Sequence, residues 1–324
     1  MSRSTSCPNA SPCSKSWRDS SASAVEAVTS PETPLARSFW RAAPFIFVLF
    51  WSGGYSFAKL GLPHTEPLTM LTLRYGLAVL LLSPFLLRRA ARWPRAARHW
   101  AALALTGFLI QCVYFGLAYQ AMKLGMNAGT TAIVMALQPI LVATLSPLVT
   151  GRPGGGKLLW IGLVLGFAGV LTVILSGDSL GPSPWGAALL ALAALLGITL
   201  ATLFEKAHGM KTDPAVGGVM QYLVGYAILA PAAWLTETMQ IDWAPEFIIS
   251  LAYLVIANSI VSVGLYIALL QRGDATRISS LMYLVPPLAL LVAWAILGEP
   301  ITAFTLLGFA LSVAGVWLVS RQKS

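Results

Sequence analysis

From Pro44 onward the sequence consists of long apolar runs that alternate with short polar stretches. A run of about 20 mostly apolar residues is long enough to cross the roughly 30 Å hydrocarbon core of a bilayer as a helix. Backbone polar groups must be paired within lipid, and the runs lack the alternating pattern of barrel strands, so each is expected to be an α-helix. Ten membrane spans are predicted, at residues 43–62, 67–88, 100–121, 127–149, 158–176, 184–204, 215–235, 247–270, 277–297 and 301–320.

The composition agrees with a membrane protein. The 324 residues are 57% hydrophobic and 10% charged, whereas an ordinary soluble domain has about 25% charged residues. These values exclude a soluble enzyme, a disordered chain and a DNA-binding domain. The three cysteines, Cys7, Cys13 and Cys112, are too few and too scattered for a disulfide framework or a metal site, and no cofactor is expected.

Residues 1–40 have a different character, because they are rich in serine and contain no long apolar run. Such a segment cannot bury enough apolar surface to offset the entropy that it would lose on ordering. It also lacks the apolar region of a signal peptide. We expect a disordered cytoplasmic tail, and an over-extended start codon is the alternative.

The charged residues predict the orientation. With the N-terminus in the cytoplasm, the basic residues of the connecting loops fall almost entirely inside, including five arginines between residues 88 and 98. This asymmetry predicts ten spans with both termini cytoplasmic. The net charge of +9 therefore reflects topology, with anionic lipid headgroups rather than nucleic acid as the partner. The outer loops carry one basic residue, Lys123, and the acidic residues Glu66, Asp178, Glu237, Asp242, Glu246 and Glu299.

The sequence also matches itself weakly at a shift of about 147 residues. At this shift Arg74-Tyr75 falls on Gln221-Tyr222, and Pro67 falls on Pro214. Each half then contains five predicted helices, and an odd number places the second half upside down relative to the first. Inverted repeats of this kind are typical of secondary transporters, which bind their substrate near the bilayer midplane between the halves.

The repeated segments resemble a known family. The stretch WSGGYSFAK from Trp51 to Lys59, followed by LRYGLA from Leu73 to Ala78, looks like the start of an EamA domain of the drug/metabolite transporter superfamily. The segment from Pro287 to Leu318, with its Gly298-Glu299 pair, is similar to the end of such a domain. After the fourth run, Thr150-Gly151-Arg152-Pro153 stands where the family usually has Gly-Glu.

The resemblance implies an all-α integral membrane protein with ten transmembrane helices, arranged as two inverted five-helix EamA repeats at residues 41–177 and 184–320. It also implies a multi-pass transporter of the bacterial inner membrane that exports amino acids, related metabolites or toxic compounds by alternating access. A membrane-embedded enzyme acting on a lipid-linked or hydrophobic substrate is the alternative, and a non-transporting sensor or assembly subunit is a third. The sequence leaves open whether the protein is a monomer or a homodimer.

Arg74 is the most informative side chain. It lies about seven residues into the second run, roughly 10 Å below the predicted outer surface at 1.5 Å per residue. An ionised side chain at this depth is costly and normally faces the interior of the bundle or a wet cavity. We expect Arg74 to bind a substrate carboxylate or to act in gating; pairing with helix-end carbonyls, or snorkelling to the surface, is the structural alternative.

Other polar and aromatic residues recur at helical spacing and are expected to face the substrate path. Trp51, Tyr55 and Lys59 share one face of the first run. Snorkelling to the headgroups explains Lys59 equally well, and interhelical hydrogen bonding explains the polar residues. Further candidates are Gln111 and Tyr114 in the third run, Gln138 beside Pro139 in the fourth, Asn258, Ser262 and Tyr266 in the eighth, Tyr283 beside Pro286-Pro287 in the ninth, and the equivalent tyrosines Tyr75 and Tyr222.

Two further patterns concern packing and energy coupling. Gly162 and Gly166, and again Gly308 and Ser312, are pairs of small residues four apart, which favour close helix contact within one chain or in a dimer. No Asp or Glu lies in the middle of a predicted span. Proton use at the helix ends, substrate exchange and facilitated export therefore all remain open.

Overall fold

The computed structural model describes residues 34–86, 93, 96–150, 156–175, 184–208, 214–265, 269 and 284–321. The contacts divide the chain into two units, residues 1–43 and residues 44–324, and the helical bundle described below belongs to the second. The predicted tail lies outside the described residues as far as residue 33, and the first described helix begins at Pro34.

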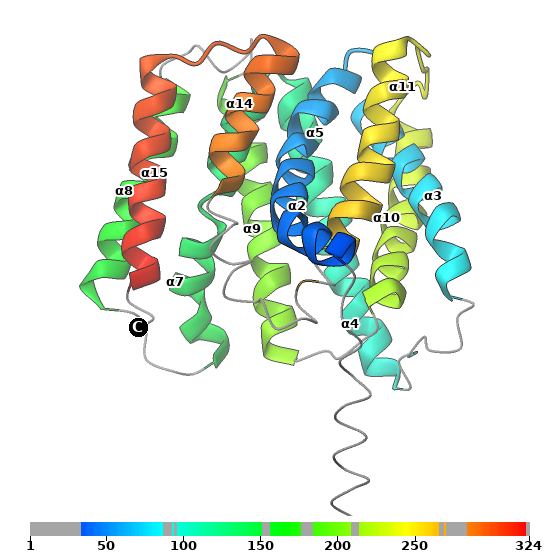
Figure 1. The fold of residues 1–324 in the computed structure, drawn as a ribbon, viewed down its shortest axis with the longest axis horizontal. Helices are drawn as coiled ribbons and strands as arrows, with labels where there is room; N and C mark the ends of the chain where they lie inside the picture. Colours follow the sequence, from blue (N-terminus) through cyan, green and yellow to red (C-terminus); the bar gives the residue numbers. More distant parts are fainter. Residues whose placement is uncertain are drawn as a thin grey trace, which may run out of the picture. The chain divides into compact units, whose positions relative to one another are not determined.

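The described residues are almost entirely helical (Figure 1). Two predicted runs contain an internal π-helical segment, and a third is divided by a short break. The elements in chain order are α2 (Pro34–Gly61), α3 (Pro67–Leu86), α4 (Ala97–Gly107), η1 (Phe108–Tyr114), α5 (Phe115–Lys123), α6 (Ala128–Met135), α7 (Gln138–Thr150), α8 (Lys157–Leu175), α9 (Pro184–His208), α10 (Pro214–Thr236), α11 (Pro245–Ala252), η2 (Tyr253–Ser262), α14 (Val285–Leu297) and α15 (Ala303–Arg321).

Seven helical segments of the described chain are long and apolar enough to cross a membrane. Val285–Leu297 and Ala303–Val319 are apolar but shorter. The fold is therefore that of a multi-pass helical membrane protein, while the count of ten spans stays a prediction. The seven segments are Pro67–Pro84, Ala97–Lys123, Ala128–Pro147, Lys157–Leu175, Trp185–Glu205, Val216–Thr236 and Pro245–Leu265.

Two pairs of helices make the most extensive contacts, and each pair joins one half of the sequence to the other. Helix α3 packs along α10, and α8 packs along α15 (Figure 1). At the predicted shift, α3 corresponds to α10 and α8 corresponds to α15, so each helix packs against its own counterpart.

Buried apolar side chains form two clusters. One surrounds Met70, Leu71 and Phe247, and includes the rings of Tyr75 and Tyr222. The other extends from α5 through α6 and α9 to α8 and α15. Arg74, Gln111 and Ser259, discussed below, are also buried, as expected for polar groups that face the interior of a membrane-spanning bundle.

Prolines mark irregular helix geometry, although not always as predicted. The fourth run is divided between Met135 and Gln138, next to Pro139, because a proline cannot bond to the carbonyl one turn earlier and kinks a helix. Pro286 and Pro287 were expected in the middle of a helix, but α14 begins at Val285 and both prolines lie in its first turn. A proline is tolerated there, because the first N–H groups of a helix have no intrahelical acceptor.

Glycines allow α8 and α15 to pack closely within one chain. A Cβ added at Gly162 would lie 2.6 Å from the carbonyl oxygen of Gly315, and one at Gly315 would lie 2.5 Å from the carbonyl oxygen of Gly162. Contacts this short do not occur between a real Cβ and a backbone oxygen, so the two backbones can approach only because neither residue carries a side chain.

We therefore predict opposite effects for two glycine-to-alanine substitutions. Gly162→Ala places a methyl group against the backbone of α15 and should lower thermal stability, with an overpacking cost of about 1–3 kcal/mol. Gly218→Ala in α10 places its methyl group in open space and should raise stability slightly, because alanine is the better helix former by about 0.5–1 kcal/mol. Melting temperatures of the detergent-solubilised variants test this; equal shifts for both would contradict the close approach.

Candidate functional site

Arg74 is buried in the interior of the bundle. Its side chain extends from α3 and is only 2% exposed. Burying an ionised group is expensive unless other groups compensate its charge, so the contacts of this guanidinium decide how the site works.

Three neutral side chains accept hydrogen bonds from the Arg74 guanidinium. Its Nε donates to Ser259 Oγ at 3.1 Å, one terminal nitrogen donates to the Tyr119 hydroxyl at 3.0 Å, and the other donates to Asn258 Oδ1 at 2.8 Å. The guanidinium carbon also lies 4.7 Å from the centre of the Phe115 ring, a distance that gives a cation–π attraction. The cation is thus held by α5 on one side and by η2 on the other.

No carboxylate compensates this charge within the described part of the chain, where the single ion pair joins His64 to Asp242. A guanidinium also carries more N–H donors than the three acceptors around Arg74 use. The arrangement therefore retains a net positive charge and spare hydrogen-bond donors in a low-dielectric setting, which is suited to binding an anionic group.

Asn258 contacts helix α2 as well as Arg74. The Asn258 amide nitrogen donates to the carbonyl oxygens of Phe50, at 3.2 Å, and Trp51, at 3.5 Å, in α2. It approaches α2 at Gly54, where an added Cβ would lie 2.7 Å from this nitrogen. Asn258 thus connects the α2 backbone to the Arg74 charge.

A second polar cluster adjoins the first. The Tyr75 hydroxyl donates to the main-chain oxygen of Gln111 at 3.0 Å, and the Tyr75 and Tyr222 rings lie 5.6 Å apart. The Gln111 side chain is buried, and its Oε1 accepts no hydrogen bond from the described residues. The structure therefore places Arg74, Tyr75, Gln111, Tyr222 and Asn258, all predicted from the sequence, in adjoining clusters.

Other predicted residues make separate contacts. The hydroxyl groups of Tyr55 and Tyr114 lie 2.7 Å apart and share a hydrogen bond between α2 and η1. The Gln138 amide nitrogen donates to Thr202 Oγ1 at 2.9 Å, which connects α7 to α9. The Trp51 ring lies 5.6 Å from the Phe47 ring.

The remaining predicted residues of the eighth and ninth runs do not join these clusters. Ser262 was expected to share a face with Asn258, but its hydroxyl donates to the Ala257 carbonyl oxygen of its own π-helical segment at 2.9 Å. Tyr266 and Tyr283 lie outside the described residues.

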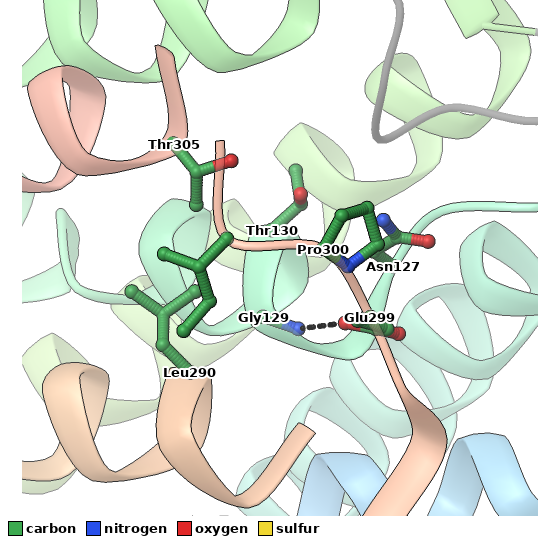
Figure 2. A pocket seen from close by; sticks show the side chains of 8 residues that line it. Asn127, Gly129, Thr130, Leu290, Glu299, Pro300 and Thr305 are labelled. Carbon is green, nitrogen blue, oxygen red and sulfur yellow. Dashed lines mark hydrogen bonds between the residues drawn. The ribbon is translucent and has the colours of Figure 1, made fainter. Parts of the chain in front are cut away.

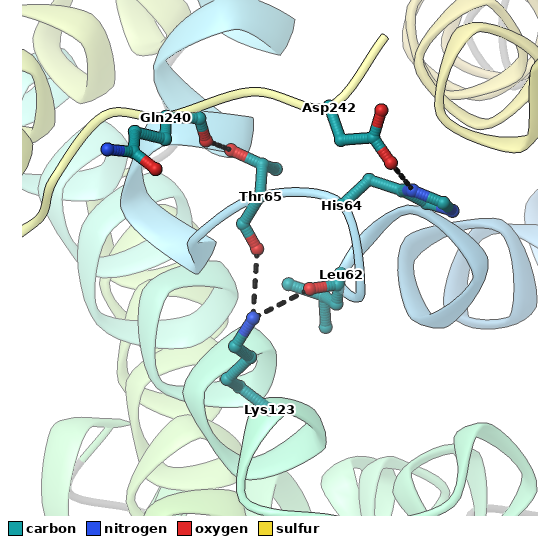
Figure 3. A network of polar contacts seen from close by, with 6 residues as sticks. All are labelled: Leu62, His64, Thr65, Lys123, Gln240 and Asp242. Carbon is teal, nitrogen blue, oxygen red and sulfur yellow. Dashed lines mark hydrogen bonds and ion pairs between the residues drawn. The ribbon is translucent and has the colours of Figure 1, made fainter. Parts of the chain in front are cut away.

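Lys59 and Lys123 connect helix ends at one end of the bundle. The Lys59 ammonium donates to the carbonyl oxygens of Met122, at 2.6 Å, and Met126, at 2.8 Å, at the end of α5. The Lys123 ammonium donates to the carbonyl oxygens of Leu62 and Thr65, just beyond the end of α2 (Figure 3). Each lysine thus neutralises the carbonyl end of the other's helix, where a cation is favoured by the helix dipole.

Carboxylates connect the two halves of the sequence at the same end, which we call the acidic face and define by Glu66, Glu237, Asp242 and Glu299. Both Glu237 oxygens accept backbone N–H groups at the start of α3, from Leu68 at 2.8 Å and from Thr69 at 2.7 Å. Glu66 accepts the backbone N–H of Thr238 at 2.6 Å. Asp242 pairs with His64 at 2.9 Å, and Gln240 accepts from Thr65 (Figure 3).

Glu299 makes an equivalent contact at the start of α6. Its two oxygens accept the backbone N–H groups of Ala128, at 2.7 Å, and Gly129, at 3.1 Å, beside a small pocket that Thr130 and Thr305 help to line (Figure 2). Burial raises the pKa of the Glu299 carboxyl above its usual value, while these two N–H groups and the charge of Lys59 lower it in part. Glu299 therefore takes up a proton at a higher pH than a free glutamate does.

Comparison with known proteins assigns the family. A model of the EamA-like transporter family matches the chain twice, at residues 39–175 and 185–321. The chain belongs to this family. The EamA-like transporter thus carries the family domain twice, and each of the two matches contains one of the π-helical segments.

Its relatives are named as transporters. The uncharacterized transporter YvbV of Bacillus subtilis is 27% identical over 85% of this chain and 90% of its own. The uncharacterized inner membrane transporter YedA of Escherichia coli K12 is 26% identical over 87% of this chain and 90% of its own. A probable amino-acid metabolite efflux pump of Salmonella typhimurium is 28% identical over 84% of this chain and 92% of its own.

A solved crystal structure shares the fold. It is 21% identical to the EamA-like transporter, covers 88% of this chain and 98% of its own, and superposes with a TM-score of 0.58. Together with the apolar helices, these similarities establish a multi-pass membrane transporter.

Three contacts of Arg74 were not predicted from the sequence. Phe115 and Tyr119 follow Gln111 at intervals of four residues, so a search along that helical face would have found them. Ser259 gives no such signal. It reaches Arg74 together with its neighbour Asn258 in the π-helical η2, a geometry that is frequent at functional sites but that sequence periodicity does not reveal.

Proposed function

We propose that this EamA-like transporter is a secondary transporter that exports small carboxylate-bearing metabolites, amino acids or related compounds, from the bacterial cytoplasm by alternating access. The proposal rests above all on one observation. Arg74 is a fully buried cation whose bonded partners are neutral. A substrate carboxylate would supply the missing charge through charge-assisted hydrogen bonds.

The position of Arg74 supports a role in transport. Its partners come from both family matches, since Tyr119 belongs to the first and Asn258 and Ser259 belong to the second. A ligand bound at the guanidinium would therefore contact both halves, which is where inverted-repeat transporters bind their substrates.

We also propose that the acidic face is the outer gate. The charge distribution of the sequence predicts that this face lies outside, and the contacts of Glu66, Glu237 and Glu299 connect the first family match to the second there. Substrate release to the outside requires these contacts to break. In this proposal, the contacts seen on the acidic face are those of a state that is closed to the outside.

Substitution of Arg74 tests the substrate site. Arg74→Gln keeps a polar side chain but removes the charge, so export should fall by about 10- to 100-fold, corresponding to the 1.5–3 kcal/mol of a hydrogen bond to a charged group. Arg74→Lys should also be impaired, because an ammonium cannot reproduce the planar fork of the guanidinium. Efflux of radiolabelled amino acids from preloaded proteoliposomes measures this.

Lys123→Gln is the matched control, because it also removes a cation but one that binds only the carbonyl oxygens of Leu62 and Thr65. Its export should be close to that of the wild type. Wild-type export by Arg74→Gln would remove Arg74 from the site, and a comparable loss of export in Lys123→Gln would assign the effect to general destabilisation.

External pH should open the proposed gate. Protonation removes the negative charge with which Glu299 holds the start of α6, and Lys59 is the charged group that faces this carboxylate. In a background without the three native cysteines, a Thr130→Cys variant should react faster with an external, membrane-impermeant thiol reagent as the pH falls. The rate is divided by that of Gln240→Cys, an exposed position on the same face.

Adding Glu299→Gln, which mimics the protonated carboxyl, should make Thr130→Cys reactive at every pH. A normalised rate that does not change with pH, and does not respond to Glu299→Gln, would contradict the gate.

A further inference from the structure

The two family matches contain π-helical segments at corresponding places. Segment η1 (Phe108–Tyr114) lies in the first match, and η2 (Tyr253–Ser262) lies in the second. The 147-residue shift carries residues 108–114 onto residues 255–261, which lie inside η2. It also carries Gln111 onto Asn258, so each π-helical segment presents an amide side chain at the same position.

The two amides differ in what they bind. Asn258 Oδ1 accepts a hydrogen bond from Arg74 at 2.8 Å. Gln111 is only 4% exposed, and its Oε1 accepts no hydrogen bond within the described chain. A buried acceptor without a donor is unfavourable, and such groups are rare in native structures.

The repeat explains why the donor is missing. The counterpart of Arg74 in the second half is Gln221, which has no guanidinium. The Gln221 amide nitrogen lies 3.5 Å from a Glu205 carboxylate oxygen instead. The position that corresponds to the Arg74–Asn258 contact therefore has its acceptor, Gln111, but not its donor.

Gln111 is held firmly in place. Its main-chain oxygen accepts the Tyr75 hydroxyl at 3.0 Å. Gly225 packs against it so closely that an added Cβ would lie 2.7 Å from Gln111 Cβ and 2.9 Å from the Tyr75 ring. These contacts hold the backbone and the Cβ of Gln111, which lowers the entropic cost of ordering its side chain around a ligand.

Gln111 and Arg74 each contact members of the same group of aromatic side chains. Tyr75, which contacts Gln111, directly follows Arg74 in the sequence. Phe115, whose ring lies 4.7 Å from the Arg74 guanidinium, comes one helical turn after Gln111. Tyr75 and Tyr222 belong to one buried cluster, and Phe115 packs against it; aromatic faces of this kind attract cationic groups.

We infer that Gln111 Oε1 binds the ammonium group of an α-amino acid whose carboxylate is held by Arg74. This assignment rests on the proposed function, and it adds the residue that would distinguish a zwitterion, with a carboxylate and a neighbouring ammonium, from a simple organic acid. The carboxylate supplies the negative charge that Arg74 lacks, and the ammonium supplies the donor that Gln111 lacks.

The test uses matched ligands. The probes are the common L-amino acids and, for the one that binds tightest, the acid without its amino group and the amine without its carboxylate. Their affinities for purified full-length protein in detergent are measured by titration. The wild type should prefer the amino acid to the acid by about tenfold or more, as expected for a hydrogen bond to a charged group.

Gln111→Leu should remove this preference while the dependence on Arg74 remains. A preference that survives in Gln111→Leu, together with loss of binding in Arg74→Gln, would overturn the assignment of Gln111 and leave the proposed function standing. Unchanged binding in Arg74→Gln would overturn the proposed function. If none of the amino acids binds the wild type, the assignment of Gln111 is overturned.

Thermal stability separates ligand binding from a structural role. Gln111→Leu replaces an unpaired buried amide with an apolar side chain and should raise the melting temperature without ligand, because the unpaired acceptor is removed. Gln138→Leu is the matched comparison and should lower it, since the Gln138 amide donates to Thr202. A lower melting temperature for Gln111→Leu would show that Gln111 stabilises the fold and would overturn the inference.

Discussion

The burial of one guanidinium constrains the interior of this transporter. An arginine at this depth must be surrounded by acceptors, and Arg74 obtains them from α5 and η2 while resting on the Phe115 ring. Asn258 extends the network to the α2 backbone. Because these partners are neutral, they satisfy the hydrogen-bonding groups of the guanidinium but not its charge. The same contacts therefore stabilise the bundle and leave a positive charge that a substrate carboxylate can neutralise.

Helix ends carry the second set of polar interactions. Lysines bind the carbonyl ends of α5 and α2, and carboxylates bind the N–H ends of α3 and α6, so each charge has the sign that its helix terminus favours. The carboxylate contacts join the two family matches, whereas the lysine contacts stay within the first. Opening the acidic face would therefore break contacts between the halves at that end, while the first half keeps its own connections there.

Much of the fold and part of the site follow from the sequence. Apolar runs locate helices because lipid leaves the backbone no other way to pair its polar groups, and the depth of Arg74 predicts that it turns inward. The π-helical segments are not predictable in this way. They shift the face on which residues lie, so that Ser259 joins Asn258 at Arg74 while Ser262 bonds within its own segment. The cap formed by Glu299 depends on a contact with residues 170 and 171 positions away in the sequence, which no local pattern encodes.

The central claim is that Arg74 holds the substrate carboxylate, and a carboxylate placed there by substitution tests it most directly. Asn258→Asp puts a negative charge where Oδ1 now lies 2.8 Å from the guanidinium, so it should compete with the substrate within the molecule. The measurement is counterflow of radiolabelled amino acids in proteoliposomes, with Asn258→Ala as the comparison. We predict that Asn258→Asp abolishes counterflow, whereas Asn258→Ala retains it. Counterflow at the wild-type rate in Asn258→Asp would contradict the account.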